Sequence, residues 1–335
     1  MIGRTVGGYI VVEKIGAGGM AMVYKAYDRG FDRFVALKVL PQLLMEDPQF
    51  RERFDREAKA IAMLEHIHIL PVYAVGEEDG IAYLAMRYIE TGTLATLLAS
   101  RTLPLPLDEA SRLLGQMAEA LDYAHRRGVL HRDMKPANVL LDADRNAYLA
   151  DFGLAKILST GDGLTGQAVI GTPMYMSPEQ VLGEEEITPA SDQYALGIVL
   201  FEMVTGQTPF FSQSTMKLLM MHLNDPVPSP HSLRAELPEL AEAVILRALA
   251  KQPQERYPDC ATLAEAFDQA LAGKGLHRLS GASVPGELRS RIDSALARVQ
   301  LDSKRPRPSR EDGPQYTPLR GPVKGEQEDE SESNG

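Results

Sequence analysis

The chain has 335 residues, of which 44% are hydrophobic and 24% charged, and its formal net charge is −11. These values are ordinary for a soluble globular protein of one or two domains, and the acidic balance argues against nucleic acid as the main partner. Cys260 is the single cysteine, which excludes an intrachain disulfide and favours a reducing compartment.

No segment of the sequence has the pattern of a membrane span or a signal peptide. The longest apolar run, YALGIVLFEMV (194–204), contains Glu202 and is too short to cross a bilayer, so it predicts a buried helix. The N-terminal MIGRTVGGYIVVEK lacks the apolar core of a signal peptide. The sequence therefore predicts a cytoplasmic chain.

Residues 9–89 are predicted to be mostly β-strand with one helix. Apolar and β-branched residues favour strands over 9–16, 21–28, 33–40 and 81–89. Asp47 followed by Pro48 is a typical helix start, and the helix is expected to continue to about Leu64.

From residue 93 onward helical patterns predominate. The stretch LDEASRLLGQMAEALDYAHRRG (107–128) predicts a helix with Asp108 as its cap and Gly128 as its end. Short strands over 139–142 and 147–151 follow, joined by the turn ADRN. After a loop-rich section, helices resume to about residue 272.

The C-terminal part changes character. Residues 303–335 are rich in proline, glycine and charge, which predicts a disordered tail. Residues 272–302 are interpreted as a linker, within which 286–301 (GELRSRIDSALARVQL) could form an amphipathic helix.

The stretch IGAGGMAMVYKA (15–26) nearly matches a phosphate-binding glycine fingerprint, with Ala21 in place of the third glycine. The glycines lead into a strand, and Lys38 rather than an acid lies on the following strand. A dinucleotide site is therefore disfavoured. Taken alone, the loop is equally compatible with a plain hairpin turn and with a flap over a nucleotide triphosphate.

Lys38 and Glu57 are candidates for an ion pair. Lys38 stands in the apolar strand VALKVL, where a buried ammonium needs a carboxylate partner. Glu57 lies within about 60° of the apolar stripe of its helix and should point toward the core.

The segment VLHRDMKPANVLL (129–141) carries the strongest chemical pattern. Asp133, Lys135 and Asn138 converge between a helix end and a strand pair, and LADFGLAK places Asp151 at the end of the next strand. Carboxylate and amide oxygens suit Mg²⁺, so Asn138 and Asp151 are the candidate metal ligands.

Together these motifs resemble those of the eukaryotic-type (Hanks-type) serine/threonine protein kinases, and most of all their bacterial members, over about residues 9–271. The resemblance implies an α+β, bilobal fold. A small antiparallel β-sheet lobe with one key helix (9–89) would follow an N-terminal extension (1–8) and precede a larger, mainly helical lobe (90–271). ATP would bind between the lobes with Mg²⁺, or alternatively Mn²⁺.

The resemblance also implies residue roles. Asp133 would accept the proton of the substrate hydroxyl, Lys135 would neutralise the γ-phosphate, and Lys38, paired with Glu57, would hold the α- and β-phosphates. Backbone near Gly16, Gly18 and Gly19 would approach the phosphates, and Met86 would be the gatekeeper residue before the hinge. The adenine would be sandwiched by Ile15, Val23, Ala36 and Leu140.

The segment from Asp151 to Glu179 resembles a kinase activation segment. Lys135 and Thr172 resemble the Ser/Thr-specific branch, and Arg132 resembles that of kinases activated by phosphorylation in this segment. The candidate acceptors are Ser159, Thr160, Thr165 and Thr172, with Thr165 favoured as the regulatory site and Thr172 as a structural residue. Glu179 is expected to pair with Arg256, and Asp192 to brace the catalytic loop.

The expected function is ATP-dependent phosphorylation of Ser and Thr hydroxyls in proteins, with autophosphorylation through a transient homodimer. A pseudokinase-type binding scaffold and a small-molecule phosphotransferase on a related fold are the alternatives. Nucleic acid is not an expected partner. The tail could dock partners or be phosphorylated at Ser303, Ser309 or Thr317, or could simply be a solvated segment.

Overall fold

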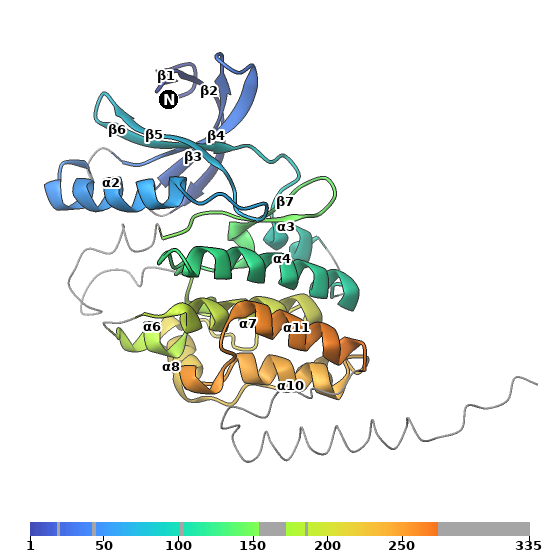
Figure 1. The fold of residues 1–335 in the computed structure, drawn as a ribbon. Helices are drawn as coiled ribbons and strands as arrows, with labels where there is room; N and C mark the ends of the chain where they lie inside the picture. Colours follow the sequence, from blue (N-terminus) through green and yellow to red (C-terminus); the bar gives the residue numbers. More distant parts are fainter. Residues whose placement is uncertain (19–20, 42–44, 101–103, 154–171, 185–186, 274–335) are drawn as a thin grey trace, which may run out of the picture.

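In the computed structural model the described residues are 1–18, 21–41, 45–100, 104–153, 172–184 and 187–273. They form a β-sheet lobe stacked on a helical lobe, with the short strand β7 and helix α3 near their junction (Figure 1). Within this part of the chain, no helix combines the length and hydropathy needed to cross a membrane.

The N-terminal lobe is an antiparallel sheet with the strand order β1-β2-β3-β4-β6-β5. Its neighbours are mostly consecutive in sequence, as expected for hairpin-connected strands. The strands are β1 (Thr5–Val6), β2 (Tyr9–Gly18), β3 (Ala21–Asp28), β4 (Arg33–Val39), β5 (Val72–Glu78) and β6 (Ile81–Arg87).

The four predicted strands are present, and two further strands complete the sheet. β1 lies in the segment expected to be an N-terminal extension, and it pairs with the start of β2. β5 escaped the sequence pattern because none of its residues is fully buried.

Helix α2 (Pro48–Ala62) packs against the sheet with the predicted apolar stripe. Asp47 caps it, since the Asp47 carboxylate accepts a hydrogen bond of 2.9 Å from the Gln49 amide. Phe50, Phe54 and Ile61 are buried on the inner face. The predicted start of the helix is confirmed.

The helical lobe is built around α4 (Leu107–His125), α7 (Pro189–Thr205), α10 (Glu239–Ala248) and α11 (Cys260–Leu271). The apolar run predicted to be a core helix is α7, which is buried over almost its whole length. Smaller elements complete the lobe: α3 (Leu94–Ala99), β7 (Val139–Leu141), β8 (Ala147–Leu149), α6 (Pro178–Leu182), α8 (Thr215–Asn224) and α9 (Pro230–Leu233).

The predicted cap of α4 is wrong. The helix begins at Leu107 after Pro106, which makes no side-chain capping bond, and Asp108 lies in the first turn. There its negative charge complements the helix dipole instead of closing the helix. At the other end the helix stops at His125, and Gly128 turns the chain with a positive φ of 73°.

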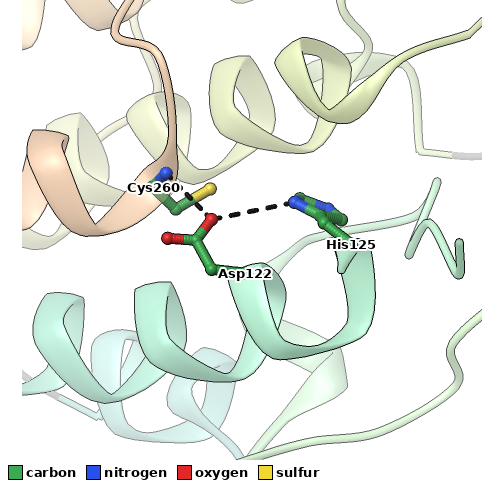
Figure 2. A group of neighbouring side chains, drawn as sticks. All are labelled: Asp122, His125 and Cys260. Carbon is green, nitrogen blue, oxygen red and sulfur yellow. Dashed lines mark hydrogen bonds and ion pairs between the residues drawn. The ribbon is translucent and has the colours of Figure 1, made fainter. Parts of the chain in front are cut away.

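Helix α11 is capped partly by a residue far away in sequence. The Asp122 carboxylate on α4 accepts hydrogen bonds from the Cys260 and Ala261 amides at 3.0 and 2.8 Å (Figure 2). This contact fixes the first turn of α11 on α4.

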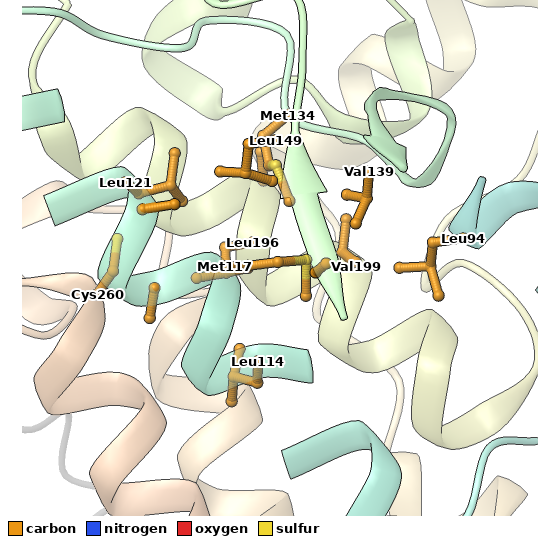
Figure 3. Close-up of a cluster of buried hydrophobic side chains, with 14 of the residues drawn as sticks. Leu94, Leu114, Met117, Leu121, Met134, Val139, Leu149, Leu196, Val199 and Cys260 are labelled. Carbon is orange, nitrogen blue, oxygen red and sulfur yellow. The ribbon is translucent and has the colours of Figure 1, made fainter. Parts of the chain in front are cut away.

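The core of the lobe lies where α4, α7 and the β7–β8 hairpin meet. Three buried residues of α4 face the buried residues Leu196 and Val199 of α7 (Figure 3). The hairpin adds Val139 and Leu149 beside them, and the residues of α4 are Leu114, Met117 and Leu121. Met134 lies in segment 129–141, which the kinase resemblance predicts to be the catalytic loop, and is buried in the same cluster. The loop before β7 is therefore anchored on the core.

Candidate active site

The residues of the predicted catalytic segment lie together between α4 and β7. Lys135 Nζ lies 2.6 Å from Asp133 Oδ2 and donates a hydrogen bond of 2.9 Å to Thr172 Oγ1. The Asn138 amide nitrogen donates to the Asp133 carbonyl and carboxylate at 2.8 and 3.1 Å. The structure therefore brings Asp133, Lys135, Asn138 and Thr172 into one hydrogen-bonded group.

Asp192 of α7 holds the backbone of this segment from beneath. Its carboxylate accepts hydrogen bonds from the His131 and Arg132 amides at 2.8 and 2.7 Å. Arg132 has a φ of 65°, a left-handed conformation that costs free energy in a non-glycine residue and has to be held by its surroundings. The two charge-assisted hydrogen bonds to Asp192 supply that hold.

His125 is a buried site residue that the sequence reasoning missed. Its Nε2 lies 2.8 Å from Asp192 Oδ2, and its Nδ1 lies 3.8 Å from Asp122 Oδ1. Burial alone would lower the pKa of His125, but the two carboxylates outweigh it and raise that pKa to about 9. His125 is therefore an imidazolium at neutral pH. In the sequence, His125 follows Asp122 by three residues on a predicted helix, a spacing that places the two side chains next to each other. This spacing could have identified His125 as a candidate.

Asp122, His125 and Cys260 also form a group of potential metal ligands, with ligand atoms within 4.8 Å of one another (Figure 2). Their polar atoms are already committed. Both Asp122 oxygens accept backbone amides, and His125 lies between two carboxylates. Burial raises the pKa of the Cys260 thiol well above its usual value. The hydrogen bonds from the Cys260 and Ala261 amides to Asp122 hold α11 on α4.

The raised pKa of His125 predicts a loss of stability in alkaline solution. Because the folded-state pKa of about 9 exceeds the ordinary value of 6.5, the stabilisation is complete below pH 6.5 and is lost as pH rises through 9. We expect this group to contribute about 3 kcal/mol to the free energy of unfolding at low pH. Urea unfolding between pH 6 and 10 measures it.

The variant His125→Gln is the control, because a neutral side chain cannot titrate. The difference in unfolding free energy between wild type and His125→Gln should shrink as pH rises from 7 to 10. An NMR titration that gives the His125 imidazole a midpoint near its ordinary value would contradict the assignment.

Lys38 and Asp151 meet across the two lobes. Lys38 Nζ on β4 lies 2.8 Å from Asp151 Oδ1, and the Lys38 side chain is 11% exposed. Burial raises the pKa of Asp151, but the Lys38 charge outweighs it, so the net pKa is lowered and the carboxylate is ionised. Asp151 has a φ of 64°, a second left-handed residue at the site.

The ion pair of Lys38 in the structure is thus with Asp151 and not with Glu57. Glu57 does point inward, as its place on the helix predicts, and its side chain is 18% exposed. Its Oε2 lies beside Gly153, 4.0 Å from the position of a Cβ there. Asp151 follows a strand next to the lobe junction, where Lys38 can reach it. Because Asp151 is the nearer carboxylate, it and not Glu57 forms the ion pair with Lys38.

Asn138 and Asp151 fit the chemistry of a divalent metal site. Because the Asn138 amide nitrogen is committed to Asp133, its oxygen is the atom left for a ligand. The Ala150 backbone amide donates a hydrogen bond of 2.9 Å to the backbone carbonyl of Asn138. This bond ties the residue before Asp151 to the catalytic loop. Two protein oxygens, one of them ionised, are typical of Mg²⁺ sites that take their other ligands from water and phosphate.

The predicted adenine-contacting residues lie on both sides of the junction. In the sheet, Ala36 of β4 lies opposite Met86 of β6, and both are buried. Val23 of β3 lies opposite Lys38 of β4. Leu140 of β7 packs on the same apolar cluster from the helical lobe. Ile15 of β2 is 40% exposed and is not among the residues of that cluster.

Of the glycine loop, Gly16 and Gly18 lie at the end of β2, where Gly18 pairs with Ala21 at the start of β3. Gly19 lies outside the described residues, as do Ser159, Thr160 and Thr165. The predicted strands β2 and β3 are therefore paired on either side of the glycine loop.

Glu179 and Arg256 form a buried bidentate ion pair with distances of 2.7 and 2.8 Å. Ser191 also donates to Glu179, and Arg256 donates to the Ala190 carbonyl at 2.7 Å. Burial raises the pKa of Glu179, but the Arg256 hydrogen bonds outweigh it and the pKa is lowered. The pair fixes α6 to the loop before α11.

Ser177 and Gln180 were not assigned a role from the sequence. The Ser177 hydroxyl accepts a hydrogen bond from the Gln180 backbone amide and so caps α6. Gln180 Nε2 donates to the Arg132 carbonyl at 3.0 Å, which connects α6 to the catalytic loop. The Ser-x-x-Gln spacing of a capping box is the signal that could have found them.

Comparison with known proteins places these features in a family. Residues 9–268 match the protein kinase domain family. The chain is 40% identical over 273 residues to the serine/threonine-protein kinase PknH of Mycobacterium bovis, covering 81% of this chain and 45% of PknH. It is also 40% identical over 258 residues to the serine/threonine-protein kinase PrkC of Bacillus subtilis, covering 77% of this chain and 40% of PrkC.

The chain thus spans less than half the length of these relatives. Among solved structures, the Mycobacterium tuberculosis PknI kinase domain superposes with a TM-score of 0.67 at 34% identity, covering 81% of this chain and 99% of that domain. The match extends over both lobes, and the chain belongs to the protein kinase family, in its bacterial, Hanks-type serine/threonine branch.

Proposed function

We propose that this chain transfers the γ-phosphoryl group of ATP to serine and threonine hydroxyls of proteins, with Mg²⁺ or Mn²⁺ at Asn138 and Asp151. The observation that carries the proposal is the contact of Lys135 with both Asp133 and Thr172. It sets a carboxylate, an ammonium and a threonine hydroxyl around one point, where an acceptor hydroxyl can be oriented.

The protein groups have separate tasks in this proposal. Bound ATP with its metal ion supplies the transferable phosphoryl group and neutralises part of its charge. Asp133 orients the acceptor hydroxyl and takes its proton, and the Lys135 ammonium attracts the negative oxygens of the transferred group. Lys38 on β4 holds the phosphates that remain with the nucleotide.

Transfer of radiolabelled phosphate tests the proposal against its alternatives. Purified chain with Mg²⁺ and ATP should label generic protein acceptors on serine and threonine, as shown by phosphoamino-acid analysis. A chain that binds ATP without transfer would be a scaffold. Labelling confined to small-molecule acceptors would favour a small-molecule phosphotransferase.

The activation segment is proposed to be switched on by phosphorylation of Thr165. Among the described residues, no side-chain partner is found for the Arg132 guanidinium, whereas its backbone is held at both N–H and C=O. A phosphate in this segment can pair with that guanidinium through charge-assisted hydrogen bonds. Autophosphorylation between two copies in a transient homodimer would place it there.

We therefore expect mass spectrometry to find phosphate on Thr165 after incubation with Mg²⁺ and ATP. The variant Thr165→Ala should phosphorylate protein acceptors about tenfold more slowly, since one to two charge-assisted hydrogen bonds are lost. Ser159→Ala in the same segment is the matched control and should be close to wild type. An active enzyme without phosphate between residues 152 and 171 would refute the switch.

A further inference from the structure

A groove lies on the helical lobe, away from the candidate active site. It has a volume of about 690 Å³ and runs between α4 and α11, with Pro238 at one side. About half of its lining residues are apolar or small, and two of them, Leu271 and Ala272, lie at the end of α11. These apolar or small lining residues are Leu107, Ser111, Gly115, Ala261, Ala264, Leu271 and Ala272.

The surface of α4 in this groove permits close approach. Gly115 stands in the middle of α4, and a Cβ built there would meet nothing within 4 Å. A glycine in a helix interior costs about 0.5–1 kcal/mol relative to alanine. The open space above it allows the backbone of a second helix to approach closely.

The rim of the groove is acidic. Asp108, Glu119, Glu265 and Asp268 line it, and all four side chains are exposed. Arg112 is the basic residue in this lining and donates to the Arg145 carbonyl at 3.2 Å, and Asp268 accepts a hydrogen bond of 3.2 Å from the Ser111 hydroxyl. The four acids outnumber this single cation, so the lining has a net negative charge. The groove therefore suits an apolar helix with basic flanks.

The sequence beyond α11 contains a segment with this pattern of apolar and basic residues. In residues 286–301 the apolar side chains Leu288, Ile292, Ala295 and Val299 recur at helical spacing. On a helix, Arg289 lies on one flank of this stripe, and Arg291 and Arg298 lie on the other. Residues 274–301 hold five Lys or Arg residues and two acidic ones.

We propose that residues 286–301 fold as an amphipathic helix into the groove between α4 and α11 of the same chain. The described chain ends at Gly273, next to the groove-lining Leu271 and Ala272. The connection over residues 274–285 can span up to about 40 Å, which is ample for the chain to turn back. Such a short tether gives an effective concentration in the millimolar range.

Hydrogen exchange on the full chain tests the docking. In wild type the amides of residues 107–119 and 261–272 should exchange about tenfold more slowly than in the apolar-face variant Leu288→Asp/Ile292→Asp. The polar-face variant Ser290→Asp/Ser294→Asp changes the opposite side of the same helix. It adds the same charge and should keep the wild-type exchange rates.

Charge reversal on the rim provides a second test. Glu119→Arg/Glu265→Arg should raise the exchange rates as the apolar-face variant does, and adding Arg289→Glu/Arg291→Glu should restore them. The control Glu13→Arg, an exposed acid on β2, should have no effect. Rescue by the compensating change would separate docking from a general loss of stability.

Three results would overturn the proposal. Exchange rates that are equal in wild type and the apolar-face variant would show that the groove is not covered by this segment. Protection that disappears on dilution would assign the groove to a second copy. Binding of wild type, but not of the apolar-face variant, to phosphatidylserine vesicles with unchanged exchange in α4 and α11 would make the segment a membrane anchor. None of these readouts depends on phosphoryl transfer.

Discussion

Asp133→Asn is expected to lower kcat for phosphorylation of protein acceptors by about 10²–10⁴-fold, the range that a positioned general base contributes. Asparagine retains the shape of the side chain and can still accept a hydrogen bond from Lys135 or Asn138, which both contact Asp133. It cannot take the proton of the acceptor hydroxyl. Steady-state kinetics with a single peptide acceptor measure the effect.

The division between kcat and KM is the sharper readout of this variant. Because Asp133 is assigned to the acceptor hydroxyl and not to the nucleotide, the KM for ATP should change little. A near wild-type circular dichroism spectrum and melting temperature should accompany the loss. If Asp133→Asn retains more than about a tenth of the wild-type rate, Asp133 is not the base and the assignment fails.

Arg256→Ala is expected to lower the free energy of unfolding by about 3–5 kcal/mol, the cost of leaving a buried carboxylate unpaired. Arg256 is fully buried, and the Glu179 side chain is 3% exposed. The variant also removes donors to the carbonyls of Ala190 and Ala250. Equilibrium unfolding in urea at pH 7 measures the loss.

Two comparisons identify the cause of that loss. The double variant Glu179→Gln/Arg256→Ala should be more stable than Arg256→Ala, because no buried charge remains. In wild type the lowered pKa of Glu179 means that its stabilisation is present above the ordinary carboxyl pKa and is lost as pH falls through the folded value. The gap between wild type and Arg256→Ala should therefore narrow below pH 4.5, and a gap independent of pH would contradict the ion-pair explanation.

Most of the fold could be predicted because its elements follow local rules. Apolar alternation marked the strands on either side of the glycine loop, and Asp47 with Pro48 marked the start of α2. The missed strand β5 contains Gly76, where a Cβ would lie 2.5 Å from the Tyr83 hydroxyl. The glycine makes room for a side chain of the neighbouring strand, and that requirement is invisible without the pairing.

Some residues of the candidate site could be predicted from the sequence, whereas contacts between distant segments could not. Asp133, Lys135, Asn138 and Asp151 are close in sequence, so their convergence follows from one short segment. The partner of Lys38 did not follow, because two carboxylates from different elements were available and only the three-dimensional structure selects Asp151. His125 was missed because its importance comes from Asp192, which lies 67 residues away in the chain.

The contact of Asp122 with the first turn of α11 links the candidate site to the end of the domain. The catalytic loop is supported by Asp192 and His125, and His125 in turn lies beside Asp122. Asp122 receives backbone donors from Cys260 and Ala261, 138 and 139 residues later. The support of the loop is therefore complete only when α11 is in place, so it depends on an element at the far end of the domain.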